Sequence, residues 1–229
     1  MLILAFETSA KAASVALLED GKLLGESYQN TGLTHSQTIM VMAEDLLKQC
    51  GKTVADVTAV AVANGPGSFT GIRIGVSAAK GLAFAADKPA VGVSTLAAMA
   101  RNVAFCDGLV ICAMDARRQQ VYNALFEAKD GRLTRLTPDR AIALEELAEE
   151  LRSDPRPKTV VGDGAKLCFA HLTEAGIPCR LAPAHLVMQN AMSVALEAEA
   201  MAAEGKLVSA QALEPVYLRP AQADRLRQK

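Results

Sequence analysis

Residues 63–75 read ANGPGSFTGIRIG, and this stretch decides the fold. An apolar run over residues 57–63 predicts a buried strand before the turn, and a run of small residues over 69–86 predicts a helix after it. Ser68 or Thr70 is placed to accept hydrogen bonds from the first free N–H groups of that helix. Such a helix start can hold an anion, but the same geometry arises wherever a strand turns into a helix that lies on its own sheet.

Around this turn the pattern predicts an α/β fold made of two similar halves. In the first half we expect three antiparallel strands, a helix, the strand and helix just described, another strand and another helix: 2–9, 13–18, 23–28, 34–50, 57–63, 69–86, 89–93 and 95–105. The second half restarts with three strands, followed by a helix, a strand and two helices: 109–115, 120–126, 133–136, 143–151, 159–161, 165–175 and 188–204.

An apolar strand that ends in an acid and continues into a hairpin occurs twice, at Glu7 and at Asp115. The repetition predicts a duplicated lobe with a cleft between the copies, which is the arrangement of actin-like and ribonuclease-H-like folds. We place the N-terminal lobe at residues 1–106 and the C-terminal lobe at residues 107–229, each with a mixed sheet flanked by helices.

Composition excludes several classes of protein. The 229 residues carry a formal net charge of −1, so bulk electrostatics would not draw the chain onto nucleic acid unaided. The five cysteines are scattered without C-x-x-C spacing, which indicates neither a disulfide framework nor a zinc site. No apolar run is long enough to span a bilayer and no signal peptide is recognisable, so we expect a cytoplasmic protein with no membrane association.

Three short segments are candidates for nucleotide binding, each with a plainer alternative. The acid and two hydroxyls of residues 7–9 could meet a metal–phosphate group, or could form a turn with local side-chain bonds. The Gly-Asp-Gly segment 162–164 could pack against a base, or Asp163 could simply cap the next helix. With the glycine turn, the candidate nucleotide-binding residues are Glu7, Thr8, Ser9, Gly65, Gly67, Ser68, Gly162 and Gly164.

No catalytic or metal-binding residue is predicted. The three histidines, His35, His171 and His185, form no H-E-x-x-H or other close pair, and no cysteine has a usable histidine partner. The turn at Asp115 and Arg117 could be an exposed ion pair or a substrate contact, and the sequence favours neither.

The motifs resemble those of the bacterial TsaB (YeaZ) family over the whole chain. The residues that carry the resemblance are ILAFETS at 3–9, GPGSFTGIRIG at 65–75, GVSTL at 92–96, DAR at 115–117 with VY at 121–122, and EPVYLR at 214–219. The resemblance implies an actin-like ATPase (ASKHA) fold with two ribonuclease-H-like lobes. It also implies a role in making N6-threonylcarbamoyladenosine at position 37 of tRNAs that read codons starting with adenosine. The implied partners are the paralogue TsaD, which transfers the threonylcarbamoyl group, and the ATPase TsaE.

Two departures from related patterns favour a non-catalytic role. TsaD proteins carry a metal-binding H-x-x-x-H, and here Thr95 and Met99 stand at the matching positions. A hydroxyl and a thioether are poor ligands for a hard or borderline cation at an open site. Glu7 stands where family members usually have Asp, which weakens a nucleotide site in this lobe. No cofactor is firmly predicted, and ATP or ADP at the partner interface is left open.

We therefore expect a scaffold without chemistry of its own, which binds TsaD and supports its active form, contacts tRNA only through the complex, and forms a homodimer when alone. The leading alternative is a stand-alone actin-like ATPase or kinase, and a peptidase is a distant one. The first lobe is the expected dimerisation lobe, because helices 34–50 and 69–86 are more apolar than one sheet requires. The expected interface residues are His35, Val41, Gly71, Arg73, Ile74, Gly75, Ala78 and Leu82.

Overall fold

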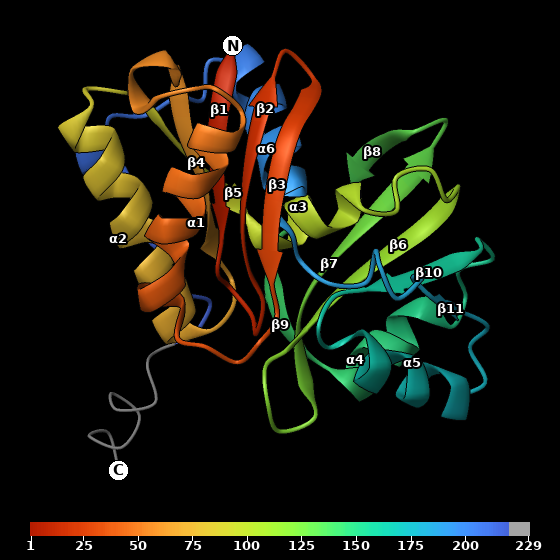
Figure 1. Ribbon diagram of the computed structural model, residues 1–229. Helices are drawn as coiled ribbons and strands as arrows, with labels where there is room; N and C mark the ends of the chain where they lie inside the picture. The colour runs from red at the N-terminus through yellow and green to blue at the C-terminus, as the bar shows by residue number, and fades with distance from the viewer. Residues whose placement is uncertain (220–229) are drawn as a thin grey trace.

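The computed structural model describes residues 1–219 and is built around two mixed β-sheets (Figure 1). The first sheet has the strand order β3-β2-β1-β4-β5, with β1 (Leu2–Glu7), β2 (Ala13–Glu19), β3 (Lys22–Gln29), β4 (Ala59–Gly65) and β5 (Ala90–Ser94). The first three strands are antiparallel, whereas β4 and β5 run parallel to β1. The central strand β1 is apolar from Leu2 to Phe6 and buried throughout, as expected for a strand covered on both faces.

The second sheet has the strand order β11-β10-β6-β7-β8, which corresponds to that of the first sheet when it is read from β8 to β11. Its strands are β6 (Gly108–Asp115), β7 (Gln120–Lys129), β8 (Arg132–Arg135), β10 (Lys158–Val161) and β11 (Arg180–Leu181), and β9 (Arg140–Ala143) also pairs with β7. In both sheets the first strand is central, with hairpin partners on one side and parallel strands on the other. The predicted α/β architecture with a duplicated strand pattern is confirmed.

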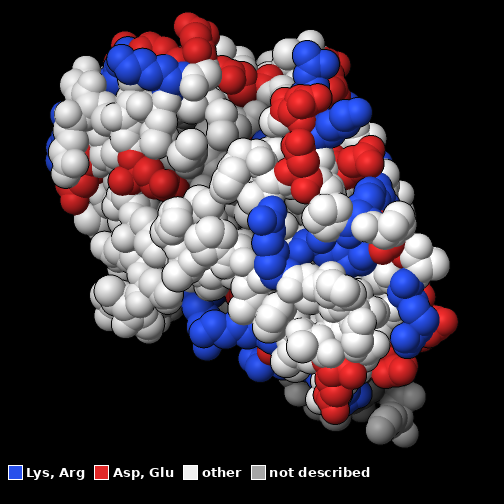
Figure 2. Space-filling view, turned by 90° about the vertical axis from the view of Figure 1, so that its right-hand side faces the viewer, with Lys and Arg blue, Asp and Glu red and all other residues white. Residues whose placement is uncertain are grey.

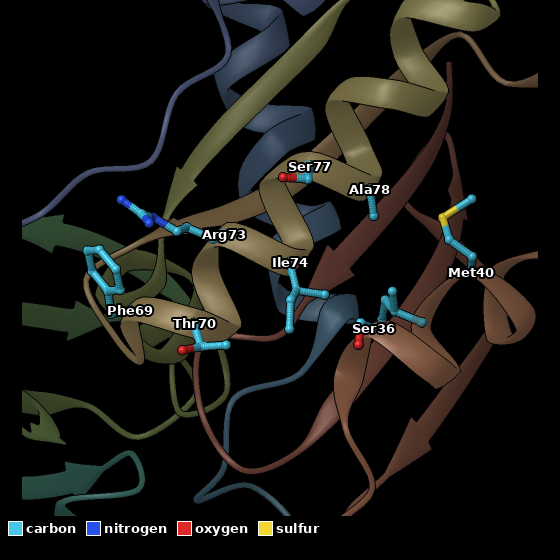
Figure 3. A pocket seen from close by; sticks show the side chains of 9 residues that line it. Ser36, Met40, Phe69, Thr70, Arg73, Ile74, Ser77 and Ala78 are labelled. Carbon is cyan, nitrogen blue, oxygen red and sulfur yellow. The ribbon is translucent and has the colours of Figure 1, made fainter.

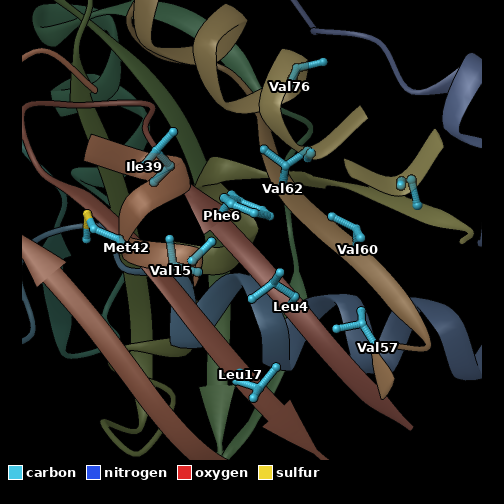
Figure 4. Packing of buried hydrophobic residues seen from close by; sticks show 14 of the residues in the cluster. Leu4, Phe6, Val15, Leu17, Ile39, Met42, Val57, Val60, Val62 and Val76 are labelled. Atoms are coloured by element: carbon cyan, nitrogen blue, oxygen red, sulfur yellow. The ribbon is translucent and has the colours of Figure 1, made fainter. Parts of the chain in front are cut away.

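Helices cover the first sheet on both faces. The helices α1 (His35–Gln49) and α2 (Phe69–Ala85) lie on one face, where Ile39 and Ile72 join the strand residues Leu4 and Phe6 in one core (Figure 4). On the opposite face α6 (Ala191–Ala203) packs Val194 and its neighbours against β1 and β2. The first lobe, meaning the first sheet with these helices, therefore has two cores.

The second sheet is covered by α4 (Leu144–Leu151) and α5 (Ala165–Glu174) on one face, and α3 (Thr95–Arg101) lies between the two sheets. Two predicted helices are shorter in the structure. The chain leaves the helical pattern after α3, well before residue 105, and α6 begins only at Ala191, because the side chain of Asn190 accepts a hydrogen bond from the N–H of Ser193 at 2.8 Å and caps the helix. Short 3₁₀ turns occur at Val54–Asp56 and Ala210–Ala212.

The division of the chain at residue 106 stays a prediction. Although α6 comes after that point in the sequence, it packs on the first sheet, and Val208 in the segment that follows forms an antiparallel bridge with Ala90 on the edge of β5. Residues 220–229 of the predicted C-terminal lobe lie outside the described part of the chain. Within residues 1–219 no helix combines the length and the apolar character needed to cross a bilayer.

Candidate functional site

The three segments predicted to bind nucleotide meet where the two sheets adjoin. The N–H of Ser68 donates to the Ser9 carbonyl at 2.7 Å, which joins the turn after β4 to the end of β1. A Cβ at Gly67 would lie 2.6 Å from that same carbonyl, and one at Gly162 would lie 3.0 Å from the sulfur of Met99. Gly67 is thus crowded by the end of β1, whereas Gly162 is crowded by α3 and by the Ala113 carbonyl of β6, 2.2 Å from the Cβ position.

Little of this junction is open to solvent. Glu7, Thr8 and Ser9 are at most 1% exposed, and the Thr8 hydroxyl donates to the Gly71 carbonyl at 2.8 Å. Gly65 has a structural role of its own, because a Cβ there would lie 2.2 Å from the Val216 carbonyl. Of the candidate nucleotide-binding residues, Gly67 is half-buried and Ser68 is exposed, so only the glycine turn reaches solvent.

Glu7 is a buried carboxyl group with one oxygen that lacks a hydrogen-bond partner in the described chain. One of its oxygens accepts a hydrogen bond from the Ser9 N–H at 2.5 Å, and the other, Oε2, has no hydrogen-bond partner among residues 1–219. Burial raises the pKa of Glu7 from its ordinary value of 4.5 to about 7; hydrogen bonding from Ser9 opposes this shift and the charge of Asp163 adds to it. The carboxyl group is therefore largely neutral below pH 7.

Asp163 is half-buried, and Thr95 and Met99 are enclosed. Burial raises the pKa of Asp163, whose carboxylate accepts a hydrogen bond from Gln189 at 2.9 Å. Thr95 is fully buried and Met99 is 1% exposed in the core between the sheets. In the described part of the chain, no group of three His, Cys, Asp or Glu side chains is arranged to hold a metal ion.

The residues predicted at a partner interface fall into two groups. Gly71 and Gly75 face inward, which corrects the prediction for them: a Cβ at Gly71 would lie 2.1 Å from the Thr8 carbonyl and one at Gly75 would lie 2.3 Å from its hydroxyl. Both glycines are therefore approached by Thr8, just after β1, Gly71 by its backbone and Gly75 by its side chain. Leu82 is half-buried against the first core.

The outward side of α2 forms a groove with α1, of about 480 Å³ (Figure 3). It is lined mainly by apolar surface from Ser36, Ile39, Met40, Phe69, Thr70, Arg73, Ile74, Ser77 and Ala78. Arg73 and Phe69 lie at one end of the groove and Met40 at the other. Val41 follows on the exposed side of α1, with 56% of its surface accessible. His35 anchors the start of α1, because its Nε2 hydrogen-bonds the Ala10 carbonyl at 2.8 Å.

Sequence reasoning gave no role to the segment after α6, which we call the strap (residues 206–219). It runs along the first lobe: the Val216 N–H donates to the Asn64 carbonyl at 2.7 Å, and Lys80 donates to the Gln211 carbonyl at 2.8 Å. Tyr217 then reaches the ring of Phe69, with the ring centroids 4.9 Å apart. The aromatic residue in EPVYLR was the one available signal for this contact.

On the face that includes the second sheet, the described residues carry both basic and acidic clusters, with a run of basic side chains near its middle (Figure 2). Arg135, Arg140 and Arg156, all in this half of the chain, each pair with a carboxylate at 2.5–2.7 Å. The Asp115 turn also holds an ion pair, at 3.2 Å to Arg117, whose side chain is 85% exposed.

Comparison with known proteins places this geometry in a family. A family model described as TsaD, tRNA N6-adenosine threonylcarbamoyltransferase, matches residues 29–220. The tRNA threonylcarbamoyladenosine biosynthesis protein TsaB of Escherichia coli is 35% identical over 226 residues, covering 96% of this chain and 95% of that protein. TsaB of Bacillus subtilis is 38% identical over 167 residues, which is 73% of each chain.

The solved structure of YeaZ from Pseudomonas aeruginosa has a TM-score of 0.82 and 29% identity, covering 95% of this chain and 99% of that one. Component A of (R)-2-hydroxyglutaryl-CoA dehydratase from Acidaminococcus fermentans, with a TM-score of 0.51 and 13% identity over 89% of this chain and 99% of that one, shares the fold alone. The predicted actin-like fold is confirmed.

Proposed function

This chain belongs to the TsaB family of tRNA threonylcarbamoyladenosine biosynthesis proteins, and we propose that it acts in that pathway as a non-catalytic subunit that binds and activates the paralogue TsaD. In this role it supports transfer of the threonylcarbamoyl group to adenosine 37 of tRNAs that read codons starting with adenosine. The pair engages the ATPase TsaE and the tRNA, and this chain touches tRNA only through the complex.

The observation that carries the proposal is the groove between α1 and α2. Met40, 43% exposed on α1, and Ile74 and Ala78 on α2 form its apolar surface. Val41, 56% exposed, lies outside the groove, on the side of α1 that faces β3. Apolar side chains gathered on two adjacent helices of one lobe are typical of a surface that another protein covers. The size of the groove suits one or two inserted side chains.

The paralogue is the occupant that the family relation favours. The TsaD family model spans residues 29–220, a range that includes both helices, so the two proteins would present equivalent helix pairs. Two related surfaces can meet about a pseudo-twofold axis, with each pair packing on the other. Without TsaD, a second copy of this chain fits the same arrangement, which accounts for the expected homodimer.

The buried junction supports a subunit without chemistry of its own. Glu7 is enclosed and largely neutral below pH 7, and Thr95 and Met99 lie in the core. A stand-alone ATPase or kinase would need an ionised acid exposed to a metal-bound nucleotide, so this alternative is disfavoured. A peptidase would need a nucleophile with an adjacent base. An adenine nucleotide, ATP or ADP, would fit best at the face shared with the partner.

Two substitutions test the docking surface, with matched changes on α5 of the second lobe as controls. Val41→Glu and Ala78→Arg place a charge in the interface and are expected to cost about 2–4 kcal/mol of association with TsaD, measured by calorimetry. Leu167→Glu and Ala170→Arg make the same changes at positions that are exposed on α5. If all four variants bound TsaD equally well, the interface would lie elsewhere.

A further inference from the structure

Arg73 sits in an unusual setting at one end of the groove. Its guanidinium carbon lies 3.9 Å from the centroid of the Phe69 ring, one helical turn earlier on α2, and 5.7 Å from the ring of Tyr217. Its Nε donates to the Tyr217 hydroxyl at 2.8 Å. The close-up view shows the guanidinium beside Phe69 at the edge of the groove (Figure 3). Two aromatic rings and one hydrogen bond therefore fix the plane of the guanidinium.

The two terminal amino groups of Arg73 have no partner in the part of the chain that the structure describes. Only Nε forms a hydrogen bond, and no carboxylate of residues 1–219 lies within 4.0 Å. Arg101 pairs with Glu197 at 2.7 Å and Arg140 pairs with Glu150 at 2.7 Å, whereas Arg118 and Arg132, like Arg73, have no carboxylate partner among residues 1–219. Arg73 is exposed, so its free edge faces whatever occupies the end of the groove.

A guanidinium held in this orientation is suited to bind an acceptor group with two oxygens. Its two free N–H groups form a planar fork that matches the two oxygens of a carboxylate, and little side-chain entropy remains to be lost on binding. The neighbouring apolar surface of Ile74 and Ala78 would exclude water from such a pair. A nucleic-acid phosphate would also fit the fork, but apolar neighbours favour an acidic side chain on a protein.

We propose that Arg73 binds a carboxylate, an aspartate or glutamate side chain, of the TsaD subunit that docks on the groove. This inference rests on the proposed function and adds a specific charged contact to an otherwise apolar surface. Tyr217 acts as a positioning residue, since its hydroxyl orients the fork and the strap carries it to α2. The strap thus contributes to partner recognition, although it lies about 140 residues further along the chain.

The test compares binding of purified TsaD from the same genome to the full chain and to four variants, by calorimetry at low and high salt. Arg73→Lys keeps the charge but loses the fork, and Arg73→Met keeps the stem only. Both are expected to weaken binding at least tenfold, with Arg73→Met also reducing its salt dependence. Tyr217→Phe keeps the ring and loses the hydroxyl, so a severalfold loss with an unchanged melting temperature is expected. Arg118→Lys, on the exposed hairpin between β6 and β7, is the matched control and should bind like the parent protein.

The carboxylate is then located by changing each Asp and Glu on the TsaD docking face to its amide. One of these changes should weaken binding to the parent chain but have little further effect on Arg73→Met. Normal binding by both Arg73 variants, while Ala78→Arg is impaired, would refute this inference and leave the groove as the docking surface. Failure of the parent chain to bind TsaD would refute the proposed function and this inference with it. Loss of tRNA binding alone in Arg73→Lys would assign the fork to a phosphate and also overturn the inference.

Discussion

Glu7→Gln is expected to remove a large part of the pH dependence of folding stability. In the unfolded chain the Glu7 carboxyl loses its proton near its ordinary pKa of 4.5, whereas the folded protein retains it up to a pKa of about 7. Between these values the folded state binds more protons, so the free energy of unfolding falls as pH rises. At about 1.36 kcal/mol per pH unit, this one group removes roughly 3 kcal/mol of stability by pH 8.

The difference in unfolding free energy between Glu7→Gln and the parent protein is the quantity to measure. Gln has nearly the shape of Glu and cannot ionise, so this difference should move by roughly 3 kcal/mol in favour of the variant between pH 4.5 and pH 8. The chain has no tryptophan, so urea unfolding is followed by far-ultraviolet circular dichroism. Glu174→Gln, at an exposed position of α5, is the control and should show no such change. A difference for Glu7→Gln that is the same at both pH values would refute the buried, neutral carboxyl.

Three further predictions follow from the same geometry. Gly75→Ala places a Cβ 2.3 Å from a threonine hydroxyl and should lower the unfolding free energy measured in urea by about 3 kcal/mol. Gly81→Ala on the same helix meets no atom within 4 Å and should raise it by about 1 kcal/mol. Equal effects of the two substitutions would contradict the packing of α2. The purified protein alone should hydrolyse neither ATP nor peptides and should hold no stoichiometric zinc or iron; ATP turnover abolished by Glu7→Ala, or one metal per chain in elemental analysis, would oppose this. Burial raises the pKa of Cys168 to about 12, so iodoacetamide should modify it only after unfolding, while the partly exposed Cys106 reacts in the native protein; mass spectrometry of native and unfolded samples decides.

Much of the fold could be predicted because its strongest signals are local. The uninterrupted apolar run from Leu2 to Phe6 indicates a strand buried on both faces, and the Asp20–Gly21 turn joins β2 to β3 as expected. The acid at the end of each first strand marked the repeat that the two sheets now display. The strand β11 was missed because two residues are too few to show a periodic pattern, and β9 was missed although β8 and β10, also of four residues, were expected.

Contacts between segments that are far apart in the sequence could not be predicted from local patterns. Nothing in the sequence of α6 indicates that it covers the first sheet, because its apolar residues would suit either sheet equally. The need for glycine at position 65 comes from its φ of 135° and from Val216, which approaches from the strap. Other segments of the same chain therefore pack against the turn that resembles an anion-binding loop.

Gly71 and Gly75 of α2, both expected at the partner interface, pack within the lobe instead. They lie one helical turn apart, which indicates that other atoms approach closely but does not identify them. In the structure those atoms are the carbonyl and the hydroxyl of Thr8, just after β1. The apolar excess of the helix remains, and it lies on the outward side at Ile74 and Ala78 beside α1. The case for a partner therefore rests on the groove and not on the glycines, and substitutions that test the partner must be made where the helix faces away from its own sheet.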